Sequence, residues 1–423
     1  MTRLKVGLEI HAYLVTNEKL FCRCISSRER GLKPNTHICP ICCGMPGAKP
    51  MRPNSEAVRK AVQIALILGC RVNTNLSWMR KHYNWPDLPK GYQTTMSGSH
   101  ATPLGISGEF EGIKISSMHL EEDPAAWDPK TGRVDYNRSG LPLVEIVTEP
   151  DFVSSHQVYE WVRKLVHALS YLKVVDTNAG VKADVNVSIV EDNGKQKTER
   201  VEVKNVTSIE AMKLAVEFEF SRQQKEGSVR ETRRFDEAKG ITMRMRGKED
   251  ADDYRFIIDP DLVPVLLEKK YIDSLKKGVP ELPSVKIEKM IKAHKISPKD
   301  ALVLSKNIDV ALFYEEVAQK IDGQFALPWV TVELLRVLNY NKKSLDDVSI
   351  SSEHFVTLLK MVKNGKITEL QAKQILNSFV PKSFDPSKTE GKISDEKELE
   401  KFILAVIKKE SRAVSEYRTG DVK

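Results

Sequence analysis

The first residues of the chain alternate between apolar and polar side chains with a period of two, which is the period of a β-strand. The polar positions include Glu9 and His11, and the apolar positions are Leu4, Val6, Leu8 and Ile10. A strand with this pattern places Glu9 and His11 on the face opposite the apolar side chains. Two more runs rich in Ile, Leu and Val, at 113–120 and 143–148, indicate further strands.

Residues 183–205 have the pattern of a β-hairpin. Two stretches in which apolar and polar residues alternate flank Asn193-Gly194, a strong turn signal. Pairing of these strands would bury the valines and gather six polar side chains on one face: Asp184, Asn186, Ser188, Arg200, Glu202 and Lys204. Such a face is often simply solvated. This mixture of carboxylates, an amide and cations suits a metal and phosphate site better.

Two helices are predicted within the strand-rich region. Residues 155–172 repeat apolar side chains at helical spacing, and Ser154 with Gln157 predicts a capping box at the start of this helix. The second helix is predicted at 208–225. Strands mixed with a few helices predict an α+β fold for this part of the chain.

The character of the chain changes after a proline-bearing linker at 279–283. Lysine-rich helical residues follow up to 340, and a helix is predicted at 351–363. Thr368 and Gln371 predict a capping box for the next helix, and the apolar stripe from Leu399 to Ile407 predicts a last one. We therefore expect three domains, which comprise residues 1–280, 281–343 and 344–423.

Composition places the chain among globular proteins. Its 423 residues are 41% hydrophobic and 29% charged, and this length favours two or three domains. No apolar run of ~18 residues is present to span a membrane. The N-terminus lacks the apolar segment of a signal peptide, so we expect a cytoplasmic protein without membrane contact. The net charge of +8 fits a polyanionic partner, but a solvated basic surface explains it equally well.

Five of the six cysteines lie between positions 22 and 43, which in a cytoplasmic chain favours metal binding over disulfides. Two close pairs, Cys22 with Cys24 and Cys39 with Cys42, match a structural zinc knuckle with four thiolate ligands. Cys43 is an alternative ligand to Cys42, and reduced, unligated cysteines are the alternative to zinc. Four protein ligands would close the site, so it would be structural and not catalytic.

The segment His119-Leu120-Glu121-Glu122-Asp123 places three carboxylates next to one another. They repel one another unless a cation holds them, so we predict a magnesium site, with a solvated charged loop as the alternative. Glu9, His11 and Glu202 offer further ligands if the fold brings them together. Magnesium beside Lys or Arg suits phosphoryl transfer. However, the chain has no Walker A motif and no Gly-rich dinucleotide fingerprint, so use of ATP would require a less common fold.

A series of long motifs runs in order along essentially the whole chain. They are VGLEIHAYL, KLFCRC, PNTHICPICCGMPG, NWPDLPKGYQ, HLEEDPA, VDYNRSGLPLVEIVTEPD, ADVNVSI, VEVKN, DEAKG, MRGKE and DYRF-x-x-x-PDL. Together they resemble the B subunit family of the GatCAB aspartyl/glutamyl-tRNA(Asn/Gln) amidotransferase. The resemblance implies a catalytic cradle domain with the zinc knuckle, then a helical domain and a small tail similar to the YqeY family.

The resemblance also implies a reaction and its partners. With ATP and Mg²⁺, the cradle phosphorylates the side-chain carboxylate of Glu-tRNA(Gln) or Asp-tRNA(Asn). Ammonia released by a separate amidase A subunit then displaces the phosphate, and a small C subunit ties A and B together. Such an enzyme is a glutamine-hydrolysing ligase that forms carbon–nitrogen bonds in protein biosynthesis.

The family motifs imply roles for individual residues. The positions that match the magnesium-binding motifs are Glu9, His11, Glu121, Glu122 and Glu202. The positions that match the nucleotide or substrate pocket are Asp184, Asn186, Ser188, Lys204 and Asn205. Lys90 and Tyr92 match the loop near which ammonia arrives. Candidate phosphate or tRNA contacts are Arg246, Lys248 and Arg255. The zinc ligands would be Cys22, Cys24, Cys39 and Cys42.

Two departures and three rival interpretations accompany this resemblance. Trp85 stands where the family commonly has phenylalanine or tyrosine, and tails of the family normally continue beyond SEYRTGDVK, so we expect an incomplete tail. The E subunit of the archaeal GatDE enzyme shares the cradle, but its large inserted domain is missing here. The two remaining rivals are a non-catalytic tRNA-binding scaffold and a stand-alone glutaminase.

Overall fold

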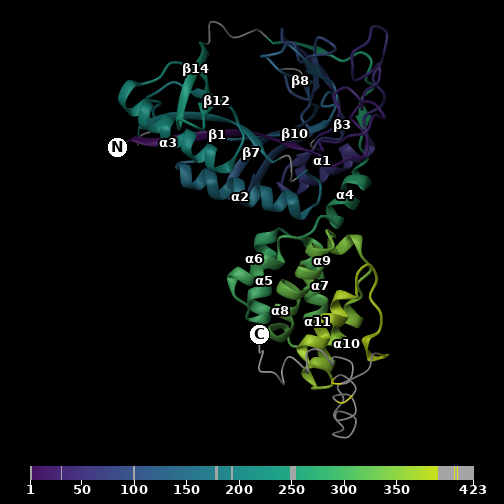
Figure 1. Ribbon diagram of the computed structural model, residues 1–423. Helices are drawn as coiled ribbons and strands as arrows, with labels where there is room; N and C mark the ends of the chain where they lie inside the picture. Colours follow the sequence, from purple (N-terminus) through teal and green to yellow (C-terminus); the bar gives the residue numbers. More distant parts are fainter. Residues whose placement is uncertain are drawn as a thin grey trace, which may run out of the picture. The chain divides into compact units, whose positions relative to one another are not determined.

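A computed structural model gives the structure of the protein. It describes residues 2–29, 31–98, 101–176, 180–191, 194–247 and 254–388, together with positions 404 and 407. The chain forms two compact units, residues 1–283 and residues 284–423 (Figure 1). Among the described residues each unit has a hydrophobic core of its own. The three-part division expected from the sequence stays a prediction.

A sheet of nine strands forms the centre of the first unit. Its strands pair antiparallel, except for β12 and β13, which run parallel. In spatial order they are β14 (Ile241–Gly247), β13 (Glu231–Asp236), β12 (Val201–Val206), β11 (Lys182–Glu191), β1 (Thr2–Tyr13), β10 (Pro142–Thr148), β7 (Ile113–Glu122), β6 (Gly105–Phe110) and β2 (Arg71–Val72). The predicted N-terminal strand is therefore the middle strand of the sheet.

Helices cover one face of this sheet. Figure 1 shows α1 (Ser55–Ile67), α2 (Ser155–Tyr171) and α3 (Ile209–Glu226) along the same side of the strands. The even-numbered apolar residues of β1, Leu4 to Ile10, are buried in the core that includes these helices. Because successive side chains of a strand point to opposite faces, Glu9 and His11 lie on the other face. The first unit ends with α4 (Lys269–Gly278).

Three smaller sheets complete the first unit. One has three strands, β15 (Arg255–Ile258), β4 (Met79–His82) and β5 (Gln93–Thr95). The other two have two strands each and consist of β16 (Val265–Leu266) with β3 (Asn75–Leu76), and β8 (Ala126–Trp127) with β9 (Val134–Asp135).

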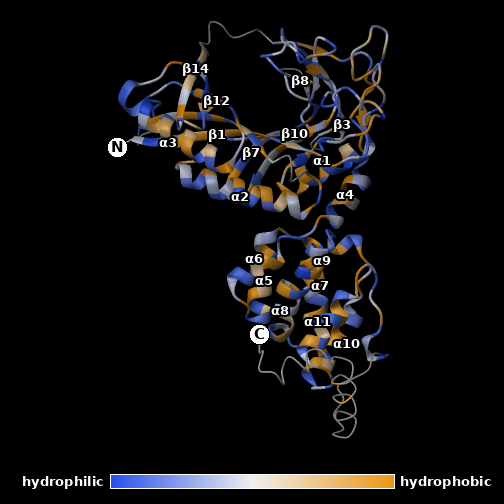
Figure 2. Cartoon of the chain, viewed as in Figure 1, coloured by the Kyte–Doolittle hydropathy of each residue, from blue (hydrophilic) through white to orange (hydrophobic). Residues whose placement is uncertain are grey.

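Up to residue 388, the described part of the second unit consists of helices and their connections, with one isolated parallel β-bridge between Ser349 and Lys382. Figure 2 shows hydrophobic and hydrophilic residues interleaved along its helices, as amphipathic helices require. In chain order the elements are α5 (Pro283–His294), α6 (Pro298–Leu304), α7 (Ile308–Ala318), α8 (Gly323–Pro328), the π-helical turn η2 (Trp329–Leu334), α9 (Leu335–Tyr340), the 3₁₀ turn η3 (Leu345–Asp347), α10 (Ser352–Lys363), α11 (Glu369–Asn377) and the 3₁₀ turn η4 (Pro386–Lys388). With the sheet of the first unit, these helices confirm the predicted α+β class.

Most predicted elements agree with the structure within a few residues. The capping box of Thr368 and Gln371 is confirmed, with both reciprocal hydrogen bonds present. The capping box predicted for α2 is only half right. Ser154 accepts a hydrogen bond from the backbone of Gln157, but the side chain of Gln157 accepts from the backbone of Val153. The predicted helix at 399–407 lies outside the described residues except for Leu404 and Ile407, and so does Asn193 of the predicted turn.

Candidate active site

Three carboxylates from three neighbouring strands converge on the sheet face opposite the helices. Glu9 on β1 lies directly opposite Asp184 on β11, and Glu202 on β12 lies opposite Asn186 on β11. One oxygen of each carboxylate lies within 4.8 Å of the other two. Apart from the cysteines, no other group of three His, Cys, Asp or Glu ligands comes this close together in the described part of the chain.

A bulge in β12 positions the cation Lys204 beside this group. Between Val203 and Val206 the strand has one residue more than the facing stretch of β11, and Asn205 adopts a left-handed backbone with φ +55°. Asp184 accepts hydrogen bonds from Lys204 Nζ at 2.9 Å and from the backbone of Asn205 at 2.8 Å. Lys204 Nζ also lies 2.9 Å from Glu202. The lysine thus bridges two of the three carboxylates.

The third carboxylate, Glu9, accepts a hydrogen bond from a side-chain amide, and Glu202 has a second hydrogen-bond partner besides Lys204. Asn186 Nδ2 donates to Glu9 at 3.0 Å, and Thr232 Oγ1 on β13 donates to Glu202 at 3.1 Å. Thr232 was not predicted from the sequence. Its strand carries several charged residues, and only the parallel pairing with β12 places it beside Glu202.

The group contains three carboxylates but only one lysine, so its negative charge exceeds its positive charge. Burial raises the pKa of Glu9, and the charges of Glu145, Asp184 and Glu202 raise it further. Burial opposes the charged form of Lys204, but Asp184 and Glu202 outweigh this effect and raise the pKa of the lysine. Carboxylates that repel one another in this way are the ligand set that a hard divalent cation stabilises. The donor set therefore fits magnesium.

A second polar row crosses the same face and contains a residue that the sequence did not single out. Glu145 on β10 faces His11 on β1 and His119 on β7. One of its oxygens lies 3.5 Å from His11 Nε2 and the other lies 2.6 Å from His119 Nδ1. Burial lowers the pKa of His11, but the hydrogen bond and charge of Glu145 outweigh it and raise that pKa to about 9. A glutamate inside the apolar run at 143–148 was the signal that could have revealed this row.

Glu121 and Glu122 lie next to each other in β7 but have different partners. Thr95 Oγ1 donates to Glu121 at 2.7 Å. Burial raises the pKa of Glu121, and the charge of Glu145 raises it further, whereas the charge of His11 lowers it. Glu122 contacts Lys90 Nζ, and it accepts a hydrogen bond from the backbone of Thr94 at 3.1 Å. Among the described residues neither glutamate belongs to the close group of Glu9, Asp184 and Glu202.

The remaining predicted residues are more dispersed. Ser188 lies on β11 opposite Lys5, two residues beyond Asn186. Arg255 is exposed at the start of β15, opposite His82, and so belongs to the three-stranded sheet. The Tyr92 ring lies 4.9 Å from Lys90 Nζ and 4.5 Å from the Arg80 guanidinium. The Arg246 side chain and Lys248 lie outside the described residues.

The four predicted cysteines come together. The Sγ atoms of Cys22, Cys24, Cys39 and Cys42 all lie within 4.8 Å of one another. Cys42 Sγ is 3.9 Å from the Sγ atoms of Cys39 and of Cys24. Tetrahedral zinc with Zn–S bonds of about 2.3 Å requires S···S distances of about 3.8 Å. The geometry therefore fits zinc, and Cys43 is not part of the group.

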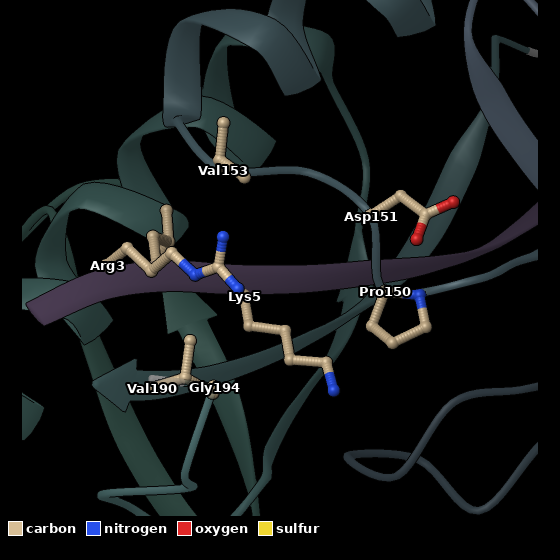
Figure 3. Close-up of a pocket in the computed structure, with 8 residues that line it drawn as sticks. Arg3, Lys5, Pro150, Asp151, Val153, Val190 and Gly194 are labelled. Carbon is tan, nitrogen blue, oxygen red and sulfur yellow. The ribbon is translucent and has the colours of Figure 1, made fainter. Parts of the chain in front are cut away.

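A cavity of about 240 Å³ lies near the beginning of β1 (Figure 3). Its lining includes the cations Arg3 and Lys5 together with Asp151. Lys5 is four residues from Glu9 along the strand, a distance of ~13 Å. The cavity is therefore separate from the carboxylate group.

Comparison with known proteins agrees with this site. Residues 4–273 match the family model of the GatB/GatE catalytic domain, and residues 312–423 match that of the GatB domain. The chain belongs to the GatB family. The matched catalytic domain contains the carboxylate group, the row of Glu145 and the cysteine cluster.

Full-length relatives of this GatB chain are named as the B subunit of aspartyl/glutamyl-tRNA(Asn/Gln) amidotransferase. The relative from Methanothermobacter thermautotrophicus is 41% identical over 428 residues, which cover 99% of this chain and 93% of the relative. The relative from Methanocaldococcus jannaschii is 40% identical over 437 residues, which cover 99% and 91%. The relative from Methanopyrus kandleri is 39% identical over 436 residues, which cover 99% and 92%.

These relatives decide between the two subunit families that share the catalytic domain. All three carry the name of the B subunit, and the GatB domain matches the end of the chain. The interpretation as an archaeal E subunit is therefore not supported. Among the described residues, no helix is long and apolar enough to cross a membrane.

Proposed function

We propose that this GatB chain performs the activating half of tRNA-dependent amidation. Its substrate would be the side-chain carboxylate of Glu-tRNA(Gln) or Asp-tRNA(Asn), as the names of its relatives indicate. The observation that carries the proposal is the group of Glu9, Asp184 and Glu202 on the sheet face opposite the helices, with Lys204 bridging Asp184 and Glu202.

The chemistry explains why a cation-binding group is needed. A carboxylate is a poor electrophile, so ammonia cannot displace its oxygen directly. In the first step a carboxylate oxygen attacks the γ-phosphorus of ATP, and ADP leaves. In the second step ammonia attacks the carbonyl carbon of the acyl phosphate, and inorganic phosphate leaves with one of the ammonia protons. Both phosphate and carboxylate are anions, so the first step requires positive charge at the point where they meet.

The residues divide this work between them. Glu9, Asp184 and Glu202 would hold a magnesium ion, which when bound offsets the negative charge of the phosphates. In this proposal Asp184 serves as a metal ligand, whereas the family motifs alone suggested a nucleotide or substrate contact. Lys204 and Asn186 orient the carboxylates, and His11, Glu121 and Glu145 line the adjoining part of the face. Lys90, bound to Glu122, would lie where ammonia arrives.

The proposal also implies partners and cofactors. Ammonia would come from the amidase A subunit, with a small C subunit holding A and B together, and zinc would occupy the four cysteines as a structural ion. Because aminoacyl-tRNA and ATP are both cytoplasmic substrates, the enzyme would work in the cytoplasm.

Reconstitution with the A and C subunits tests the proposal. We expect Mg²⁺-dependent ATP hydrolysis that Glu-tRNA(Gln) or Asp-tRNA(Asn) stimulates, together with formation of the amidated aminoacyl-tRNA. Asp184→Asn keeps the size of the side chain but removes its charge, so we expect amidation to fall about 100-fold or more. The matched control is Glu109→Gln, because Glu109 is an exposed carboxylate of β6 in the same sheet.

The same assay separates the rival functions. A tRNA-binding scaffold would bind tRNA but leave ATP hydrolysis unstimulated, and a stand-alone glutaminase would release ammonia from glutamine without the A subunit. Equal activity of the Asp184 and Glu109 variants would contradict the assignment of the carboxylate group.

A further inference from the structure

The cysteine cluster touches the Lys90 loop, residues 85–92, through backbone atoms. The contact is made by Gly44, which lies two residues after Cys42. Gly44 has a left-handed backbone with φ +67°. A Cβ atom at this position would lie 2.3 Å from Pro89 O and 2.8 Å from Lys90 N. Real Cβ contacts are not this short, so the two backbones meet where only glycine fits.

The segment that carries Gly44 is itself tightly folded. The backbone N–H groups of Cys43, Gly44 and Met45 donate to the carbonyls of Cys39, Ile41 and Pro40 at 3.0, 3.1 and 2.9 Å. Lys19, whose side chain is only 1% exposed, donates to Cys42 Sγ at 3.6 Å and to the Tyr136 carbonyl at 3.1 Å. This buried cation would offset part of the negative charge of four thiolates that bind a metal ion.

The Lys90 loop, in contrast, depends on its neighbours for its position. Turn contacts from Leu88 N to Trp85 O at 3.3 Å and from Gly91 N to Leu88 O at 3.1 Å fold it. Its two prolines, Pro86 and Pro89, have no N–H to donate. The carbonyl of Asp87 accepts a hydrogen bond from the backbone of Ala125 at 2.8 Å, so the contact with Gly44 is the second backbone constraint on the loop and the one that acts at Pro89 and Lys90.

A second link joins the cysteine segment to the other side of the Lys90–Glu122 pair. Ser139 Oγ donates to the carbonyl of Cys42 at 2.7 Å, and Gly140 N donates to the carbonyl of Asp123 at 2.9 Å. Asp123 follows Glu122 directly in the chain. Ser139, Lys90 and Glu122 also line one small cavity. The cysteine segment therefore contacts the chain beside both partners of the ion pair.

We propose that the cysteine cluster positions the Lys90–Glu122 pair, and that Gly44 is the positioning residue through which it does so. Filling of the cluster by its metal would fix the Gly44 backbone, and the Pro89–Lys90 backbone would rest against it. The importance of Lys90 for amide transfer rests on the proposed function, whereas the mechanical coupling does not.

Two glycine variants test the coupling in the full-length protein. Gly44 and Gly47 both have left-handed backbones, but a Cβ on Gly47 would meet nothing within 4 Å. Gly47→Ala therefore reproduces the backbone strain without the contact. We expect Gly44→Ala to speed amide hydrogen exchange at residues 88–95 at least about tenfold, while Gly47→Ala leaves it unchanged. Equal exchange in the two variants at these residues would overturn the proposal.

Metal removal from the unmodified protein provides a second test that does not depend on a variant folding. A chelator strong enough to strip zinc should speed exchange at 88–95, and returning zinc should slow it again, with metal content measured in parallel. Unchanged exchange at 88–95 after complete metal loss would also overturn the proposal.

An amidation assay then distinguishes a failure of this proposal from a failure of the proposed function. In the reconstituted enzyme supplied with ammonium salt, Gly44→Ala should lower kcat for amidation more than it changes KM for the aminoacyl-tRNA. If the unmodified enzyme shows no amidation at all, the proposed function fails, but the exchange results still decide the coupling.

Discussion

At the scale of single residues, the site is defined by groups whose charge is set by their neighbours. Lys204 remains charged because two carboxylates surround it, and His11 takes up a proton readily because Glu145 lies beside it. In both cases the neighbouring carboxylates raise the pKa above that of the isolated side chain. The raised pKa of His11 makes the charge of this sheet face depend on pH.

His11 leads to a prediction about stability in magnesium-free buffer. Its pKa in the folded protein, about 9, lies above its ordinary value of 6.5. Its contribution to stability, about 3 kcal/mol, is therefore fully present below about pH 6.5 and is lost as the pH rises through about 9. Thermal unfolding of His11→Gln should approach that of the unmodified protein as the pH rises. His156, an exposed histidine of α2, is the matched control, and His156→Gln should show no such trend.

At the scale of elements, a buried charged network attaches α3 to the edge of the sheet. Glu219 of α3 is fully buried and lies 2.8 Å from Arg222 and 3.2 Å from Arg233, and it also contacts Thr242. Arg233 belongs to β13, the strand whose Thr232 donates to Glu202. The network therefore holds β13 from the helix side of the sheet, while Thr232 of the same strand contacts the carboxylate group on the other side.

Removal of the central carboxylate should be costly. Glu219→Ala leaves Arg222 and Arg233 to share Glu231 as their remaining buried carboxylate, so one buried positive charge is no longer balanced. We expect the free energy of unfolding to fall by about 3–5 kcal/mol. Glu217 is an exposed residue of the same helix, so Glu217→Ala should cost less than about 1 kcal/mol. Urea unfolding followed by circular dichroism measures both values. Similar losses in the two variants would contradict a structural role for the network.

At the scale of the whole molecule, each unit has its own core, and the boundary between them can be tested. Leu275, Val279 and Leu282 pack against the core of the first unit, although the matched catalytic domain ends at residue 273. We therefore expect residues 1–283 to fold alone and to unfold cooperatively. A fragment that ends at 273 lacks these three side chains and should melt several degrees lower. Equal melting temperatures would show that the core ends earlier.

The sequence by itself determined most of the elements and indicated several side chains that the structure brings together. A period of two in β1 and β11 separated core residues from the polar face, because a strand exposes alternate side chains on opposite sides. The spacing of two cysteine pairs predicted a thiolate group, because zinc requires four ligands in a small volume. Both predictions agree with the structure, since they depend on residues close in sequence.

Only the tertiary structure decided which distant residues meet. Strand order placed Asp184 opposite Glu9 and Glu145 opposite His11. In the folded chain Glu122 pairs with Lys90 and does not join the carboxylate group. The bulge that turns Lys204 and Asn205 toward Asp184, and the contact of Gly44 with Pro89, arise from pairing and packing. No local pattern encodes them, because register and packing are properties of segments that are far apart in the chain.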